Sequence, residues 1–239
     1  MPTSKPYHNI YRHGPEPVNR PFIESRKSPV VKRFLQSFEI LKRDLQHIFE
    51  FIEPCTDNYS TYSQRTFELL LRACTEIETN CKQILRVNSH PVNNSNILRF
   101  ADLDGPMKLS EYIVCCPAID FPDFSPFRSF VHTDRNQRSP SWYRAYNEAK
   151  HDRANSFSSA HLKNVIESIG AVYVILSAQY GYHFDGGLGA VNGISAGSPK
   201  YFSLRSHPSW SVDESYQFDW PTLSSTTNPY DFHPIPQIP

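Results

Sequence analysis

The chain has few of the features that mark several large protein classes. It carries 24 basic and 24 acidic side chains among its 239 residues, so its formal net charge is zero. A neutral chain offers no general attraction for nucleic acids, and any such binding would have to come from a local patch. No apolar run reaches the ~18 residues of a membrane span, so we expect no membrane association.

Cysteine is scarce as well. The five cysteines stand at positions 55, 74, 81, 115 and 116. An odd number, without a C-x-x-C pair and without a signal-peptide pattern, predicts reduced thiols in a cytoplasmic protein. Cys74 and Cys81 fall on one helical face and are expected to act as small core residues. No Cys/His cluster has the spacing of a zinc site, and we expect neither a metal nor a cofactor.

Only nine glycines stand against twenty prolines, and the prolines divide the chain into regular and irregular blocks. They gather before residue 30, between 91 and 140, and after 199, which marks much of the chain as non-helical. We therefore predict three parts: an N-terminal arm at 1–28, a helical domain at 29–180 with an irregular insertion at 87–140, and a Gly/Pro-rich extension at 181–239.

Three segments have the apolar periodicity of long helices, which predicts a mainly α fold. The first begins at Ser28-Pro29 and ends before Pro54, the second runs from Thr61 to Arg86, and the third runs from Ser159 to Tyr180. The third is apolar nearly all round and should be the most buried.

The remaining segments predict only small elements. Leu109–Cys116 fits either a strand or a short helix, and the aromatic residues of Phe121–Phe130 are expected to cover the helices. Weak alternation in Lys200–Leu204 and Ser215–Trp220 predicts a small C-terminal β-hairpin.

A shorter fourth helix is predicted in the stretch Trp142–Arg153, which follows Ser139-Pro140-Ser141. Its aromatic and small residues fall on one side: Trp142, Ala145, Tyr146 and Ala149. Arg144, Asn147 and His151 fall together on the other, at spacings that stack side chains on a helix. This polar face therefore carries a guanidinium, an amide and an imidazole. Such a set suits proton transfer and charge stabilisation at a phosphodiester, although a solvated polar face has the same composition.

Glu78 lies inside the apolar stripe of the second helix, next to Cys74 and Cys81. A carboxylate in that position is costly unless it is paired, so a partner is expected. The candidates are Arg144, Lys150 and Arg153. Two interpretations stay open: a structural buried ion pair, or a carboxylate that positions a functional cation or imidazole.

The helices and the Arg–His spacing together resemble the HEPN superfamily. The similarity lies in Phe67–Lys82, in Trp142–Arg153 and in the apolar final helix, and it covers less than half of the chain. The string Tyr146-Asn147-Glu148-Ala149-Lys150-His151-Asp152-Arg153 is similar to that of uncharacterised bacterial HEPN-like proteins. The fold that this resemblance implies is a four-helix bundle with long irregular insertions.

In function, the resemblance implies a metal-independent endoribonuclease that acts as a toxin or an anti-phage effector. Arg144 and His151 would be its catalytic residues, and a homodimer formed through their helix face would bring two motifs over one RNA. Six residues separate the pair, at the long end of the family's range, and Ala145 stands where the family usually has a polar residue.

Two functional hypotheses therefore remain. In the first, His151 transfers protons, Arg144 stabilises the phosphate, and Asn147 and Glu78 support them. In the second, the chain is an inactive HEPN-like module that binds a protein partner, such as an antitoxin, or a nucleotide. His151 and the supporting residues Lys150, Asp152 and Arg153 would then make structural ion pairs, and the aromatic loops would bind the protein partner.

Overall fold

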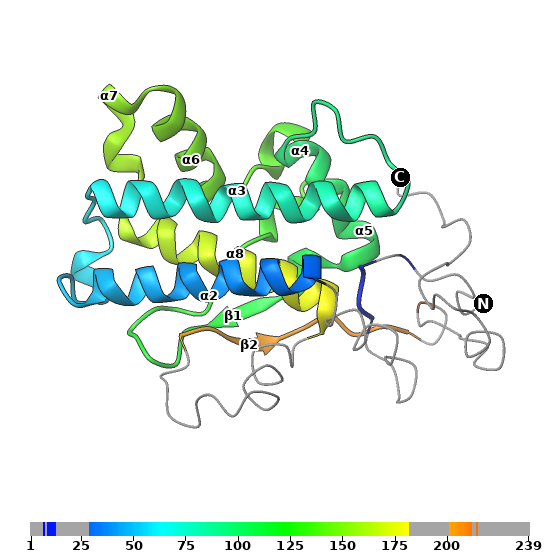
Figure 1. Cartoon of the computed structure of the whole chain (residues 1–239), viewed down its shortest axis with the longest axis horizontal. Coiled ribbons are helices and arrows are strands. Elements are labelled where there is room, and N and C mark those ends of the chain that lie inside the picture. Colours follow the sequence, from blue (N-terminus) through cyan, green and yellow to red (C-terminus); the bar gives the residue numbers. More distant parts are fainter. Residues whose placement is uncertain (1–6, 8, 13–28, 182–200, 212–213, 215–239) are drawn as a thin grey trace.

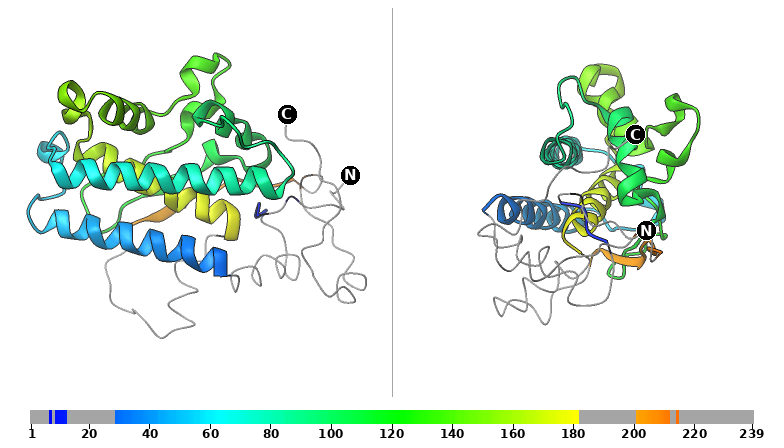
Figure 2. Two further views of the ribbon diagram at one scale, coloured as in Figure 1. Left: turned by 45° about the horizontal axis from the view of Figure 1, so that its top comes forward. Right: turned by 90° about the vertical axis from the view of Figure 1, so that its right-hand side faces the viewer.

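Four helices, which pack against one another, form the body of the molecule. The structure is a computed structural model, and it describes residues 7, 9–12, 29–181, 201–211 and 214. The longest helices are α2 (Pro29–Phe49), α3 (Gln64–Val87) and α8 (Leu162–Tyr180), with the shorter α6 (Ser141–His151) beside them. Helices α2 and α3 contact each other, and α8 contacts both (Figures 1 and 2). The prediction of a mainly helical chain is confirmed.

The first two long helices form where the apolar periodicity predicts them. Helix α2 begins at Pro29, whose fixed φ suits the first helical position, and its buried residues follow a spacing of three and four: Val31, Leu35, Phe38, Leu41, Leu45 and Ile48. Helix α3 begins with a capping box. The Thr66 backbone N–H donates to Ser63 Oγ at 3.2 Å, and the Ser63 N–H donates to Thr66 Oγ1 at 2.7 Å. This exchange satisfies two N–H groups that would otherwise lack partners.

Helix α8 is the centre of the core. All of its residues except Lys163 and Glu167 are buried, which confirms the prediction that the last helix is the most buried one. Two of its polar side chains are satisfied inside the core. Gln179 Nε2 donates to Asn80 Oδ1 of α3 at 2.9 Å, and the hydroxyl of Ser177 donates to the Tyr173 carbonyl at 2.8 Å.

The segment between α3 and α6 packs against the helices through short elements. These are α4 (Ile97–Phe100), α5 (Asp104–Met107), strand β1 (Ile113–Cys115) and the 3-10 turns Ala101–Leu103, Leu109–Glu111, Arg128–Val131 and Arg135–Arg138. Residues 109–116 thus form a helical turn and then a strand, where the sequence left both open. Phe127 and Phe130 are buried, and the Trp142 indole donates to the Pro126 carbonyl at 2.9 Å. The predicted aromatic cover over the helices is present.

One strand of the hairpin that the sequence suggests is present, and it pairs with a strand from the middle of the chain. Strand β2 (Ser203–Ser206) pairs antiparallel with β1, with Val114 opposite Leu204. The proposed second strand, 215–220, lies outside the described residues. Phe202, just before β2, is buried against Phe38 and Tyr173. The first described residues of the C-terminal extension therefore belong to the helical core.

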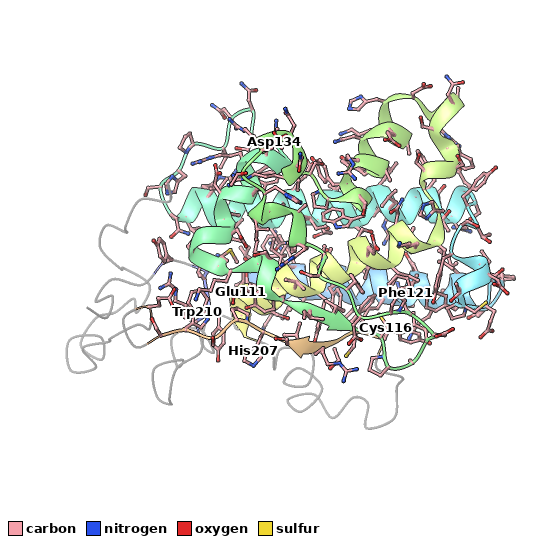
Figure 3. The ribbon with its side chains drawn as sticks, turned by 180° about the vertical axis from the view of Figure 1, so that it is seen from behind. Glu111, Cys116, Phe121, Asp134, His207 and Trp210 are labelled. Atoms are coloured by element: carbon pink, nitrogen blue, oxygen red, sulfur yellow. The ribbon has the colours of Figure 1, made fainter. Side chains whose placement is uncertain are left out.

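Part of the predicted N-terminal arm also packs on the body. The Tyr11 N–H donates to the Ala178 carbonyl at 2.8 Å, and the Arg12 guanidinium lies 4.5 Å from the centre of the Trp210 ring. Figure 3 shows Trp210 and His207 along the chain that follows β2, away from Asp134.

Within the described ranges, no helix combines the length and the apolar character needed to cross a bilayer.

Candidate functional site

Helix α6 has one packed face and one open face, as its sequence predicts. The buried residues are Trp142, Tyr143, Ala145, Tyr146 and Ala149, and the helix contacts α3 and α8. It ends at His151, earlier than the break expected near Asn155. The Asp152 carboxylate accepts the Asn155 backbone N–H at 3.4 Å and caps a separate short helix, α7 (Arg153–Ser156).

The open face carries the three residues of the predicted catalytic set. Arg144 and His151 are exposed and Asn147 is half-buried. The His151 imidazole forms no hydrogen bond or ion pair with any residue that the structure describes. The Arg144 guanidinium donates to the Ser139 carbonyl, at the start of the helix.

Arg144 and His151 share a side of α6 but lie apart along it. Seven residues correspond to about 10 Å of helix at 1.5 Å per residue. Because the Arg144 guanidinium turns back to Ser139, it lies toward the N-terminal end of α6, whereas His151 is the last residue of the helix. The two groups do not meet within one chain.

Glu78 has a partner on α6, but that partner is none of the three expected cations. The Tyr143 hydroxyl donates to Glu78 Oε1 at 2.8 Å, and Lys82 Nζ lies 3.5 Å from Oε2. The reason is geometric: Tyr143 is on the packed face of α6, which meets α3, while Arg144 is on the open face. Burial and the bond to Glu78 raise the pKa of Tyr143, so its phenol remains a donor. Glu78 therefore does not join Arg144 and His151.

Lys150 completes a polar cluster between α3 and α6. Its ammonium donates to Tyr146 Oη at 2.9 Å, and the rings of Tyr143 and Tyr146 are 5.3 Å apart. The bond to Tyr146 and the nearby charge of Glu78 raise the pKa of Lys150. We call Glu78, Tyr143, Tyr146 and Lys150 the α3–α6 polar cluster. Cys74 is fully buried beside it, and burial together with the Glu78 charge raises the pKa of that thiol. Cys74 is therefore a packed, protonated side chain.

Arg153 and Asp152 hold the end of the motif in place. The Arg153 guanidinium lies 4.8 Å from the centre of the Phe67 ring and 5.4 Å from that of Phe157, and it donates to the Gln64 side chain. These contacts attach α7 to the start of α3. Arg153, one of the three candidate partners of Glu78, does not pair with it, because Arg153 belongs to α7, beyond the end of α6.

A cavity of about 490 Å³ lies beside the N-terminal half of α6. Its polar lining includes Arg128, His132, Asn136, Gln137, Arg144 and Glu167. His151 is not among the lining residues. Figure 3 shows Asp134, which precedes the turn Arg135–Arg138, on the same side of α3 as α6. Arg128 and His132 were not predicted as candidate site residues. The sequence does contain a signal for them, because residues 128–144 include four arginines and a single acidic residue, Asp134.

A second cavity, of about 580 Å³, lies between the end of α2 and the start of α3. Its apolar wall contains Ile48, Phe51 and Leu69, and its charged groups already have partners within or beside the cavity. Arg72 bonds Asp44, and His47 lies 3.1 Å from Glu50. Although this cavity is larger, it contains none of the motif residues, so we place the candidate site at α6.

The described residues contain no group of three His, Cys, Asp or Glu side chains arranged to hold a metal ion. All five cysteines are free thiols. No protein-family model, no curated protein and no solved structure matches the chain. A functional hypothesis must therefore come from the geometry of the residues.

Proposed function

We propose that the chain is a metal-independent endoribonuclease of HEPN type that uses the open face of α6. The observation that carries this proposal is the His151 imidazole, which is exposed and unbonded among the described residues on the same side of α6 as Arg144. An imidazole without a structural partner is available to exchange protons with a substrate. Its neighbours on the packed face are all engaged in the core.

The proposed reaction uses the nucleophile that RNA itself carries. The 2′-oxygen attacks the adjacent phosphorus while its proton is removed, and the 5′-oxygen of the next nucleotide leaves with a proton. His151 transfers one of these protons, and Arg144 stabilises the negative charge that develops on the phosphate oxygens. Asn147, one turn from each, orients the substrate. The products are a 2′,3′-cyclic phosphate and a 5′-hydroxyl.

The separation of the two groups supports a site shared between two copies of the chain. Arg144 and His151 are about 10 Å apart along α6, and the guanidinium turns away from the imidazole. If two α6 faces pack together, His151 of one copy can approach Arg144 of the other. We therefore propose a homodimer through this face, with RNA bound across it. The biological role that fits is that of a toxin or an anti-phage effector.

The test compares the purified wild type with His151→Ala on a mixed RNA substrate. Removal of a proton-transfer group should lower the cleavage rate by about 100-fold or more. His47→Ala is the matched control, because His47 is an exposed histidine on α2, and its rate should equal that of the wild type. Equal cleavage by wild type and His151→Ala would refute the catalytic assignment.

One observation favours a second candidate, an inactive module that binds a protein or nucleotide partner. The α3–α6 polar cluster is internally bonded: Tyr143 donates to Glu78 and Lys150 donates to Tyr146. These bonds give Glu78 and Lys150 a structural role in the packing of α6 on α3 and take them out of the predicted catalytic set. This candidate predicts that the wild type leaves RNA intact and that His151→Ala binds the same partner.

A further inference from the structure

The cavity beside α6 carries positive charge that the surrounding residues do not neutralise. Arg128 and His132 are exposed, and their side chains form no hydrogen bond or ion pair with the described residues. Among the described residues, the one hydrogen-bond partner of the Arg144 side chain is a neutral carbonyl, that of Ser139. Arg138 is different, because its guanidinium lies 3.1 Å from the Asp102 carboxylate. The excess charge therefore belongs to Arg128 and Arg144, which line the same cavity.

Glu167 is the one residue with a carboxylate among the described residues that line the cavity, and it already has partners. It accepts a hydrogen bond from the Ser141 hydroxyl at 3.3 Å and lies 3.9 Å from Lys163 Nζ. Burial also raises the pKa of Glu167, which disfavours its charged form. Glu167 does not cancel the two guanidinium groups.

The cavity also has the size and the apolar surface that a nucleotide unit needs. Its volume of about 490 Å³ exceeds that of a bare phosphate and lies within the usual range of small-molecule sites. Phe124, Pro126 and Pro140 form part of the lining, so a base or ribose can pack there while the phosphate meets the arginines.

We propose that this cavity is a subsite that holds one nucleotide of the bound RNA. Arg128 and Arg144 donate to its phosphate, and His132 contributes a third N–H donor. The identity of the ligand as RNA rests on the proposed function, but phosphate binding by this cavity does not require cleavage. The subsite lies at the N-terminal end of α6, where the proposed homodimer would bring His151 of the second copy close to Arg144.

The test measures binding of a fluorescein-labelled RNA of twelve nucleotides by anisotropy, with Arg128→Gln, Arg144→Gln and His132→Asn. The RNA carries 2′-O-methyl groups, so it lacks the attacking hydroxyl and stays intact during the measurement. Loss of one charge-assisted hydrogen bond should raise Kd by about 10-fold for each arginine variant. The slope of log Kd against log salt should fall by about 0.7 for each lost phosphate contact. Circular dichroism checks that each variant is folded.

The matched control is Arg135→Gln. Arg135 is exposed and lies in the same arginine-rich segment, but it does not line the cavity. Its loss removes the same charge and should change Kd by less than about 2-fold, because a charge outside the site acts only through screened attraction. A second measurement follows the amide NMR spectrum of the wild type during titration with uridine 3′-monophosphate. Shifts should centre on residues 125–144.

The outcomes separate this inference from the proposed function. Equal weakening by Arg128→Gln and Arg135→Gln would mean attraction by bulk charge and would overturn the subsite. Binding of RNA by Arg128→Gln as tightly as by the wild type would overturn it too, even if His151→Ala abolished cleavage. Selective weakening by Arg128→Gln without any cleavage by the wild type would support the subsite and refute the ribonuclease.

Discussion

The Tyr143 hydroxyl donates a hydrogen bond of 2.8 Å to Glu78 Oε1 and so joins α6 to α3. Tyr143 is 4% exposed, and the Glu78 side chain is 20% exposed. A hydrogen bond to a charged group in such surroundings is worth more than one at the surface. This contact holds the packed face of α6 in place and thereby sets the direction in which Arg144 and His151 point.

Tyr143→Phe removes only this hydroxyl. We expect the free energy of unfolding to fall by about 1.5–3 kcal/mol, because Glu78 would keep only the longer contact with Lys82. Urea denaturation measures the change. Tyr62→Phe is the control, since Tyr62 is half exposed and its hydroxyl has no hydrogen bond among the described residues. A loss in Tyr143→Phe no greater than in the control would show that the bond contributes nothing.

Ser63→Ala tests the capping box at the start of α3. The substitution removes the acceptor of the Thr66 N–H, and loss of such a cap costs about 1 kcal/mol. Thermal or urea unfolding should show this decrease. Ser60→Ala, the same change at an exposed serine in the preceding turn, should leave stability within about 0.5 kcal/mol of the wild type. A stable Ser63→Ala would contradict the role of the cap.

Glu167→Gln tests the pH dependence of stability. Burial raises the pKa of Glu167 in the folded chain, so the folded state keeps a proton that the unfolded state loses near pH 4.3. The stability that this protonated group contributes is fully present below the pKa of Glu167 in the unfolded chain. It is lost as the pH rises through the pKa of Glu167 in the folded chain. The glutamine variant has no such loss. Its stability relative to wild type should therefore improve between pH 4 and pH 7 in urea titrations. A constant difference, or one of opposite sign, would contradict the assigned shift.

Local periodicity was enough to predict the long helices. In α2, α3 and α8 the apolar side chains recur every three or four residues. This spacing is a property of neighbouring positions in the chain, so the sequence alone reveals it. Likewise, the two faces of α6 follow from the positions of Trp142 and Arg144. The placement of one helix against another was not predictable in the same way. The partner of Glu78 is Tyr143 because of how α6 meets α3, and the sequence suggested cations instead.

Contacts between distant parts of the chain could not be predicted from the sequence, for the same reason. Cys115 pairs with Ser203 in the sheet, and Asn80 accepts a hydrogen bond from Gln179 in the core. No local pattern records such a pairing. The cavity at α6 is an intermediate case, since its arginines are dense between residues 128 and 144. That density predicts a basic patch, while only the fold reveals that Arg128 and Arg144 face one cavity.

The most direct test of the proposed ribonuclease is the chemistry of the RNA ends that it leaves. The wild type, incubated with a defined RNA in the presence of EDTA, should produce fragments with a 2′,3′-cyclic phosphate and a 5′-hydroxyl, as read by mass spectrometry. His151→Ala should produce none above background. Fragments that carry a 5′-phosphate, or intact RNA in the wild-type reaction, would contradict the assignment of His151 and Arg144 to a metal-independent attack by the 2′-hydroxyl.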